Sequence, residues 1–318
     1  MQNSLWVRII GAILSAVSIV FVAKVMGGAA MRGQYSLVSW SEIRVLLLFF
    51  PVSCGMAFLM VYPWKWVLEF VLKRRIRLKE IFAVYAGSNV AKYWPGGFWQ
   101  YLMRNFLGRN LNMTQWQIGT SSLLEILCVV IGTGTIVFFI AAARWSYSRK
   151  LEYAPVELQR IFDYSGIFIL IALLCVILIK FWLSRSLRTQ NVKFDYWEMG
   201  GLFLKVTVAH FIYFVLASVS FAFFLREFTV DAIGMLDAWV VGEVFILAFF
   251  AGFVVPGAPS GLGIREVFLL FALSPHYGTG PVLLAAFCHR FLLILGDVGI
   301  WILSRFNLSL SNYVSSKI

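Results

Sequence analysis

Apolar runs near or above 18 residues recur along this whole sequence, and they constrain the fold more than any other feature. A run of that length crosses the hydrocarbon core of a bilayer as a helix. Only 13% of the residues are charged, and no polar stretch exceeds about 20 residues, so a separate soluble domain has no place. The sequence therefore predicts an all-α polytopic membrane protein in which residues 1–318 form a single integral membrane domain.

Basic loops set the orientation of the predicted spans. Residues 73–79 contain five cations in seven positions, and residues 180–193 contain four more. By the positive-inside rule both loops are cytoplasmic, and so are both chain termini. We expect about six full spans, near residues 5–26, 45–71, 116–142, 164–182, 200–225 and 282–303. Pro51 and Pro63 are expected to kink the second span.

Two further apolar segments are each interrupted by a Pro-Gly pair. The first break reads Pro95-Gly96-Gly97, and the second reads Pro256-Gly257. Each is expected to form a re-entrant pair of half-helices, which gives eight membrane segments in all. Paired broken helices are typical of transporters built from two inverted halves, here residues 1–142 and 164–305. Residues 239–255 are also long enough to cross outright, and a simple kink is the alternative at either break.

Charged residues at membrane depth mark the candidate site, because each costs roughly 2.5–3.5 kcal/mol at a helix centre. An arginine follows each break proline by nine positions. A half-helix that begins inside the bilayer also presents free N–H groups and the positive end of its dipole, which favour a phosphate. The residues predicted to bind a lipid phosphate are Lys92, Pro95, Gly96, Gly97, Arg104, Pro256, Gly257, Ser260, Gly261, Gly263, Arg265 and Arg290.

Four acids lie in or near the same segments: Glu125, Glu243, Glu266 and Asp297. We expect them to neutralise the basic residues in the absence of substrate, or to carry a coupling proton. Internal ion pairing without a transport role is the alternative for any one of them. The histidines have unrelated spacing and the cysteines form no CxxC motif, so no metal is expected. No Walker loop or nucleophile elbow is present, and no cofactor is predicted.

Both motifs resemble those of a known family. Residues Ala91 to Gln100 are similar to a KYxPGxxWQ element, and Pro256 to Glu266 are similar to a PGGxGxRE element. Both elements belong to the transmembrane region of lysylphosphatidylglycerol synthetases and their stand-alone, flippase-like relatives. The resemblance covers most of the chain, and Glu125 and Arg290 fall where that family places an acid and an arginine. It implies a bacterial or archaeal inner-membrane protein that moves a lipid headgroup, without the aminoacyl-transferring domain.

The expected function is therefore lipid transport rather than catalysis. The predicted substrate is the headgroup of an anionic phospholipid or of a polyprenyl-linked glycan. One alternative is an intramembrane transferase that uses Glu125, Glu243 or Asp297 as a general base. Another is a non-transporting subunit for envelope assembly. A partner enzyme that supplies the lipid and self-association both stay open. Nucleic acid is not expected as a partner, because the net charge of +12 fits cationic loops against lipid headgroups.

Overall fold

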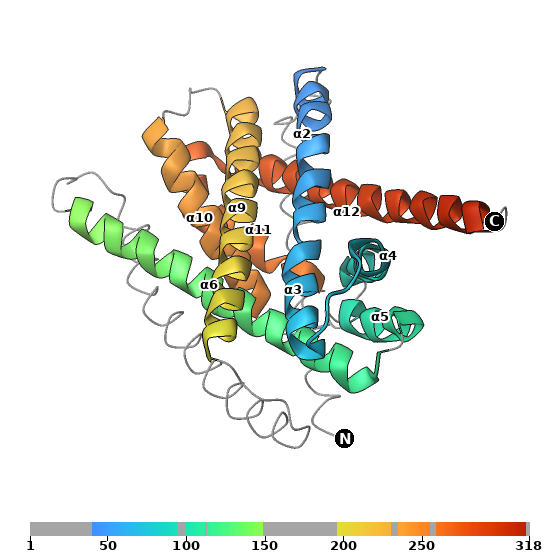
Figure 1. The fold of residues 1–318 in the computed structure, drawn as a ribbon. Helices are drawn as coiled ribbons and strands as arrows, with labels where there is room; N and C mark the ends of the chain where they lie inside the picture. Colours follow the sequence, from blue (N-terminus) through green and yellow to red (C-terminus); the bar gives the residue numbers. More distant parts are fainter. Residues whose placement is uncertain are drawn as a thin grey trace, which may run out of the picture.

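The computed structural model describes residues 40–93, 99–111, 113–148, 196–229, 235–254 and 259–315. Within these ranges all regular secondary structure is helical, which confirms the predicted class (Figure 1). The α-helices are α2 (Trp40–Leu59), α3 (Val61–Leu72), α4 (Leu78–Asn89), α5 (Trp99–Gly108), α6 (Gln115–Ser148), α9 (Tyr196–Phe228), α10 (Met235–Val254), α11 (Ile264–Tyr277) and α12 (Thr279–Ser315). Three 3₁₀ turns are η1 (Val90–Tyr93), η2 (Arg109–Leu111) and η3 (Pro259–Gly261).

Four helical segments are long and apolar enough to cross a membrane. They are Ile43–Leu72, Gln115–Ile136, Trp197–Phe228 and Thr279–Phe306, and they correspond to four of the predicted spans. The spans predicted at residues 5–26 and 164–182 lie outside the described residues. In α10 the apolar stretch Ala238–Phe253 is shorter than these four. The protein is thus a multi-pass membrane protein.

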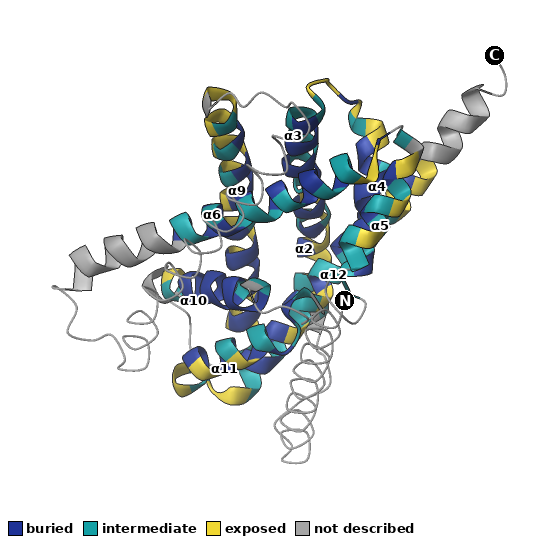
Figure 2. Cartoon of the chain, turned by 90° about the horizontal axis from the view of Figure 1, so that it is seen from below, coloured by how far each residue is buried: buried dark blue, intermediate teal, exposed yellow. Residues whose placement is uncertain are grey.

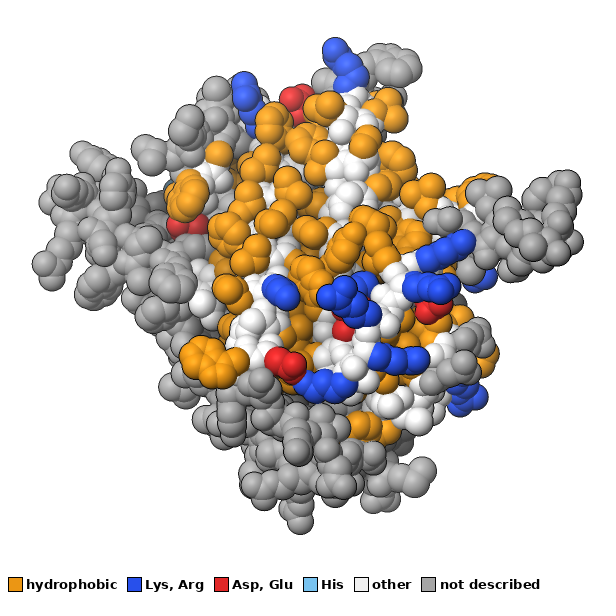
Figure 3. Space-filling model, in the orientation of Figure 1, with side chains coloured by type: hydrophobic (Ala, Val, Ile, Leu, Met, Phe, Trp, Pro, Cys, Tyr) orange, Lys and Arg blue, Asp and Glu red, His pale blue; other side chains and the backbone are white. Residues whose placement is uncertain are grey.

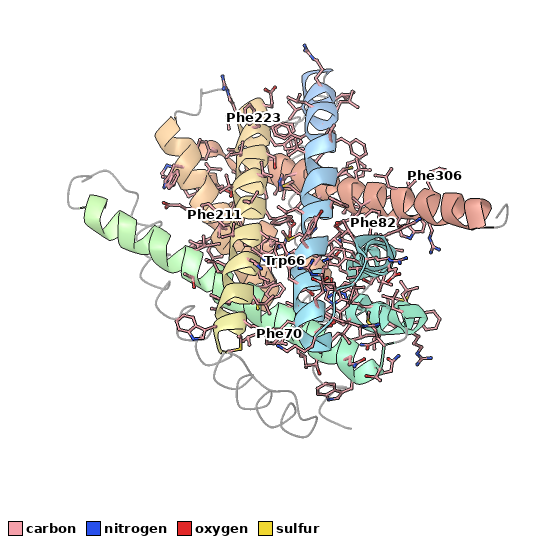
Figure 4. All side chains as sticks on the ribbon, in the orientation of Figure 1. Trp66, Phe70, Phe82, Phe211, Phe223 and Phe306 are labelled. Atoms are coloured by element: carbon pink, nitrogen blue, oxygen red, sulfur yellow. The ribbon has the colours of Figure 1, made fainter. Side chains whose placement is uncertain are left out.

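The outer surface carries an apolar face over α2 and α9 (Figure 3). Large hydrophobic side chains there are freely exposed, as expected for contact with lipid; Phe211 and Phe223 project from α9 (Figure 4). Exposed basic side chains gather where α3 leads into α4 (Figure 3). At that end Lys73 also forms an ion pair with Glu198 at the start of α9. The end of α3 and the start of α9, which adjoin the two basic loops, therefore lie together.

Proline chemistry explains the division of the long apolar segment into α2 and α3. The two helices are separated at Met60, three residues before Pro63. Pro63 has no amide hydrogen, so it leaves the carbonyl of Leu59 without its helical partner. The break therefore falls where Pro63 predicts it. Pro51, by contrast, lies inside α2, which continues past it.

Close helix packing surrounds the centre of the molecule. The helix α10 is buried along most of its length (Figure 2), and its aromatic side chains pack against those of α9. The helices α2 and α12 approach at backbone level, because a Cβ atom at Gly296 would lie 2.7 Å from the carbonyl oxygen of Ser53. Small residues permit such contact between membrane helices, where dispersion rather than water exclusion drives association.

Each predicted broken segment has a described helix on either side of its break. The helices α4 and α5 have 12 and 10 residues. In sequence α4 precedes the first break and α5 follows it, and in space the two helices pack against each other. Neither is long enough to cross a bilayer alone. At the second break, η3 separates α10 from the 14-residue α11. Pro95, Gly96, Gly97, Pro256 and Gly257 themselves lie outside the described residues.

Candidate functional site

A cavity of about 330 Å³ lies between the described elements that flank the two breaks. The turn η1, which precedes the first break, packs against η3, which follows the second. Both halves of the chain therefore line one space. Its charged lining consists of Lys92, Arg104, Glu125, Arg265 and Asp297. Ser260 and Gly261 of η3 line it too, so seven of the sequence-predicted residues come together here.

Asp297 connects the two halves at this cavity. It lies on α12 and is only 4% exposed. Its Oδ1 accepts a hydrogen bond of 2.6 Å from Asn89 Nδ2, and its Oδ2 accepts one from the Tyr93 hydroxyl. Lys92 Nζ lies 2.7 Å from Oδ2. Three donors from α4 and η1 thus converge on one carboxylate, which compensates for the cost of burying its charge.

Arg104 is held entirely within the first half. It is 2% exposed on α5, and its Nη1 donates to Glu125 Oε2 on α6. The rings of Trp64, Tyr85 and Tyr101 surround the guanidinium, with their centroids 4.6, 5.0 and 5.7 Å from Cζ. Aromatic faces attract a desolvated cation. Arg104 is therefore already neutralised by an acid and enclosed by aromatic rings.

Arg290 connects α12 to η3 and to the start of α11 without lining the cavity. From α12 its Nη2 donates to the carbonyl oxygen of Ser260 at 2.9 Å, and its Nη1 donates to Glu266 Oε1. The other oxygen of Glu266 accepts the backbone N–H of Gly263 at 2.6 Å. The Gly263 amide at the start of α11, which we expected to face a phosphate, is thus bonded to the protein's own carboxylate. Ser260 and Gly261 adopt left-handed φ angles of 51° and 69°, which form the turn.

Arg265 differs from the other three cations. Among the residues that the structure describes, no carboxylate lies within ion-pair distance of it. Its Cζ lies 3.8 Å from the centroid of Phe249. Its buried Nε has no hydrogen-bond partner, a feature that it shares with Arg104. The side chain passes over Gly252, where a Cβ atom would come within 2.7 Å of Arg265 Cγ. The guanidinium therefore lines the cavity with an uncompensated charge.

Some predicted residues lie beside the cavity rather than in it. Gly263 and Glu266 adjoin the lining, and Glu243 is buried in α10 without lining it. Sequence reasoning missed Asn89, Tyr93 and Phe249. Asn89 precedes Lys92 by three residues, the spacing that places two side chains on one face of a helical turn, so its role had a signal. Phe249 had none, because it is one of 30 phenylalanines.

The described residues contain no group of three or more His, Cys, Asp or Glu side chains that could hold a metal ion. His210 lines the cavity with Nδ1 2.8 Å from the carbonyl oxygen of Val206. The arrangement offers one unpaired cation, two ion pairs and several phenol groups to an anionic ligand.

No family model matches the chain, and no curated protein matches it significantly.

Proposed function

We propose that this protein moves the anionic headgroup of a membrane lipid across the bilayer. The observation that carries the proposal is that two broken helical segments, one from each half of the chain, meet at one charged cavity. Transporters of inverted-repeat type bind their substrates at such a meeting of discontinuous helices. The proposed setting is the cytoplasmic membrane of a bacterium or archaeon, with both termini in the cytoplasm.

The size and chemistry of the cavity support a headgroup as the ligand. About 330 Å³ is at the lower end of the range for small-molecule pockets, which suits a headgroup without its acyl chains. The acyl chains would stay in the lipid beside the apolar outer surface. Ion pairs keep the cavity polar without leaving several charges uncompensated, which a membrane interior does not tolerate.

The cluster on Asp297 suggests how the two halves move. Its three donors come from α4 and η1, whereas the carboxylate is on α12. Opening the cavity to one side of the membrane would separate these groups, and closing it would bring them together again. In this proposal the lipid phosphate contacts Arg265 while the halves are apart, and Lys92 pairs with Asp297 again when they close.

Transport is tested in vesicles that contain the purified protein and lipids with a fluorophore on one acyl chain, so that the headgroup is unchanged. An impermeant quencher reports the fraction of label that reaches the outer leaflet. We expect this fraction to rise faster in vesicles with the wild-type protein than in empty vesicles. Arg265→Ala should lose most of that increase in rate. Arg305→Ala is the matched control, because Arg305 is exposed on α12 away from the cavity.

Two outcomes would contradict the proposal. If no lipid from a panel of native extracts moves faster than in empty vesicles, the protein is not a transporter of these lipids. If Arg265→Ala moves lipid at the wild-type rate, the cavity is not the route. Mass spectrometry of the recovered lipid separates the transferase alternative, which requires a covalent change.

A further inference from the structure

We infer that the cavity takes a ligand with a single negative charge, a phosphodiester, and that Arg265 alone is its counter-cation. The inference rests on the proposed function for the source of the ligand, a membrane lipid. It goes further than the proposed function in two ways. Diphosphates and phosphomonoesters are excluded as ligands, and the other three cations are inferred to form ion pairs within the protein instead of contacting the ligand.

Charge balance around the cavity gives the first argument. Four cations and three carboxylates lie in its lining or one contact behind it. They are Lys92, Arg104, Arg265 and Arg290, with Glu125, Glu266 and Asp297. Three ion pairs use every one of these carboxylates and leave one cation over. A ligand with one negative charge therefore brings the site to neutrality, whereas a dianion overshoots it.

Geometry identifies the remaining cation as Arg265. Unlike the other three cations, it has no carboxylate within ion-pair distance among the described residues, and the ring of Phe249 covers its guanidinium at 3.8 Å. Glu243 of α10 is not close enough to neutralise it, because nine residues of helix, about 13 Å, separate Glu243 from Gly252, over which Arg265 lies. The stacked arginine fork is preorganised to bind two oxygens of one phosphate.

The existing ion pairs turn this balance into selectivity. A second ligand charge would meet only cations that already have carboxylate partners, and a buried charge without a partner is strongly disfavoured. A neutral headgroup, in turn, leaves Arg265 unpaired. One charge-assisted hydrogen-bonded contact corresponds to a ratio of about 10- to 100-fold in Kd between a ligand that makes the contact and one that does not.

The test measures equilibrium binding to the full chain in detergent micelles. Three probes share short dihexanoyl chains and differ in headgroup charge: dihexanoylglycerol is neutral, dihexanoyl phosphatidylglycerol has one charge, and dihexanoyl phosphatidic acid approaches two. A fourth probe, farnesyl phosphoryl glucose, places the singly charged phosphodiester on a prenyl chain. We expect phosphatidylglycerol or the farnesyl phosphodiester to bind at least tenfold tighter than the neutral and doubly charged lipids. Whichever of the two binds better identifies the source of the headgroup.

Two cavity variants move the charge in opposite directions. Arg265→Gln removes the unpaired cation and should abolish the preference, while Arg265→Lys should keep part of it. Asp297→Asn releases Lys92, which is 24% exposed and tolerates the loss of its partner. In that variant the ratio of the Kd of phosphatidic acid to the Kd of phosphatidylglycerol should fall by about tenfold. Arg305→Gln should bind all probes as the wild type does.

Several results would overturn the inference. Tighter wild-type binding of phosphatidic acid, unchanged binding by Arg265→Gln, or no shift in Asp297→Asn would each do so. If Arg265→Gln does not fold, the shift in Asp297→Asn decides. Binding is measured without movement, so selective binding by a protein that moves no lipid overturns only the proposed transport. Transport with a preference for the doubly charged lipid overturns only the inference.

Discussion

Removing Glu125 should destabilise the protein far more than removing an acid at the surface. Arg104, its partner, is 2% exposed and lies among three aromatic rings. In Glu125→Leu the guanidinium keeps its aromatic contacts and stays almost fully buried. Its charge is then buried without a partner, which typically costs about 3–5 kcal/mol of unfolding free energy.

Replacing both members of the pair should restore most of that loss. Methionine at position 104 fills the space between the rings with a flexible thioether that makes favourable contacts with aromatic edges. With leucine at position 125, no buried charge remains. Exchanging a buried ion pair for apolar residues of similar volume is often neutral or stabilising. We therefore expect Arg104→Met/Glu125→Leu to lie within about 2 kcal/mol of the wild type.

The assay is reversible unfolding by sodium dodecyl sulfate in mixed micelles, followed by tryptophan fluorescence. The exposed pair Lys73–Glu198 supplies the control, because Glu198→Gln should cost less than about 1 kcal/mol. Binding of phosphatidylglycerol by the stable double variant then separates a structural role of Arg104 from the phosphate-binding role that the sequence predicts.

A cost below about 1 kcal/mol for Glu125→Leu would refute the reasoning, since it would mean that the site is well hydrated. A double variant as unstable as Glu125→Leu would refute it as well. In that case the pair would be needed for specific packing and not only for mutual neutralisation.

Three further predictions concern other parts of the molecule. Gly252→Ala should slow transport and weaken phosphodiester binding several-fold, because the new Cβ would lie 2.7 Å from Arg265 Cγ and displace that side chain; both assays described above measure it. Gly296→Val should lower stability by about 1–3 kcal/mol, since its side chain meets the backbone of Ser53 at 2.7 Å; unfolding in mixed micelles measures the loss. A cysteine at Arg75, in a background without native cysteines, should react with an impermeant maleimide only after the inner face of the membrane is exposed.

The two glycine predictions each have a control variant. Gly119→Ala and Gly55→Val add the same side chains where nothing lies within 4 Å of the new Cβ atom, so they should lower neither transport nor stability. If they behave like Gly252→Ala and Gly296→Val, general glycine effects explain both results. Labelling at position 75 in intact cells would place the basic loop outside and reverse the predicted orientation.

The helical class and the membrane spans could be predicted from sequence because they depend on local hydrophobicity. The break after Met60 likewise follows from one missing amide hydrogen at Pro63. The cap on α11 also had a local signal, since Glu266 follows Gly263 by three residues, as in a capping box. These features need no knowledge of how distant helices pack.

The pairing of the buried charges could not be predicted in this way. Asn89 and Asp297 are 208 residues apart in the chain, and no local pattern relates them. All four cations near the cavity also look equivalent in the sequence. Only the arrangement of α5, α6, α11 and α12 shows that Arg104 and Arg290 have acidic partners. The distinction between them and Arg265 is therefore a property of the tertiary structure.

The convergence of three donors on Asp297 has a consequence for how this protein can diverge. A change at position 297 alone leaves Asn89, Lys92 and Tyr93 without their acceptor at once, so single substitutions there should be rare among homologues. Lineages that lose the carboxylate should often have replaced Lys92 as well, because its ammonium then has no counter-charge. Positions 89, 92, 93 and 297 should then vary as one evolutionary unit, which an alignment of relatives can test.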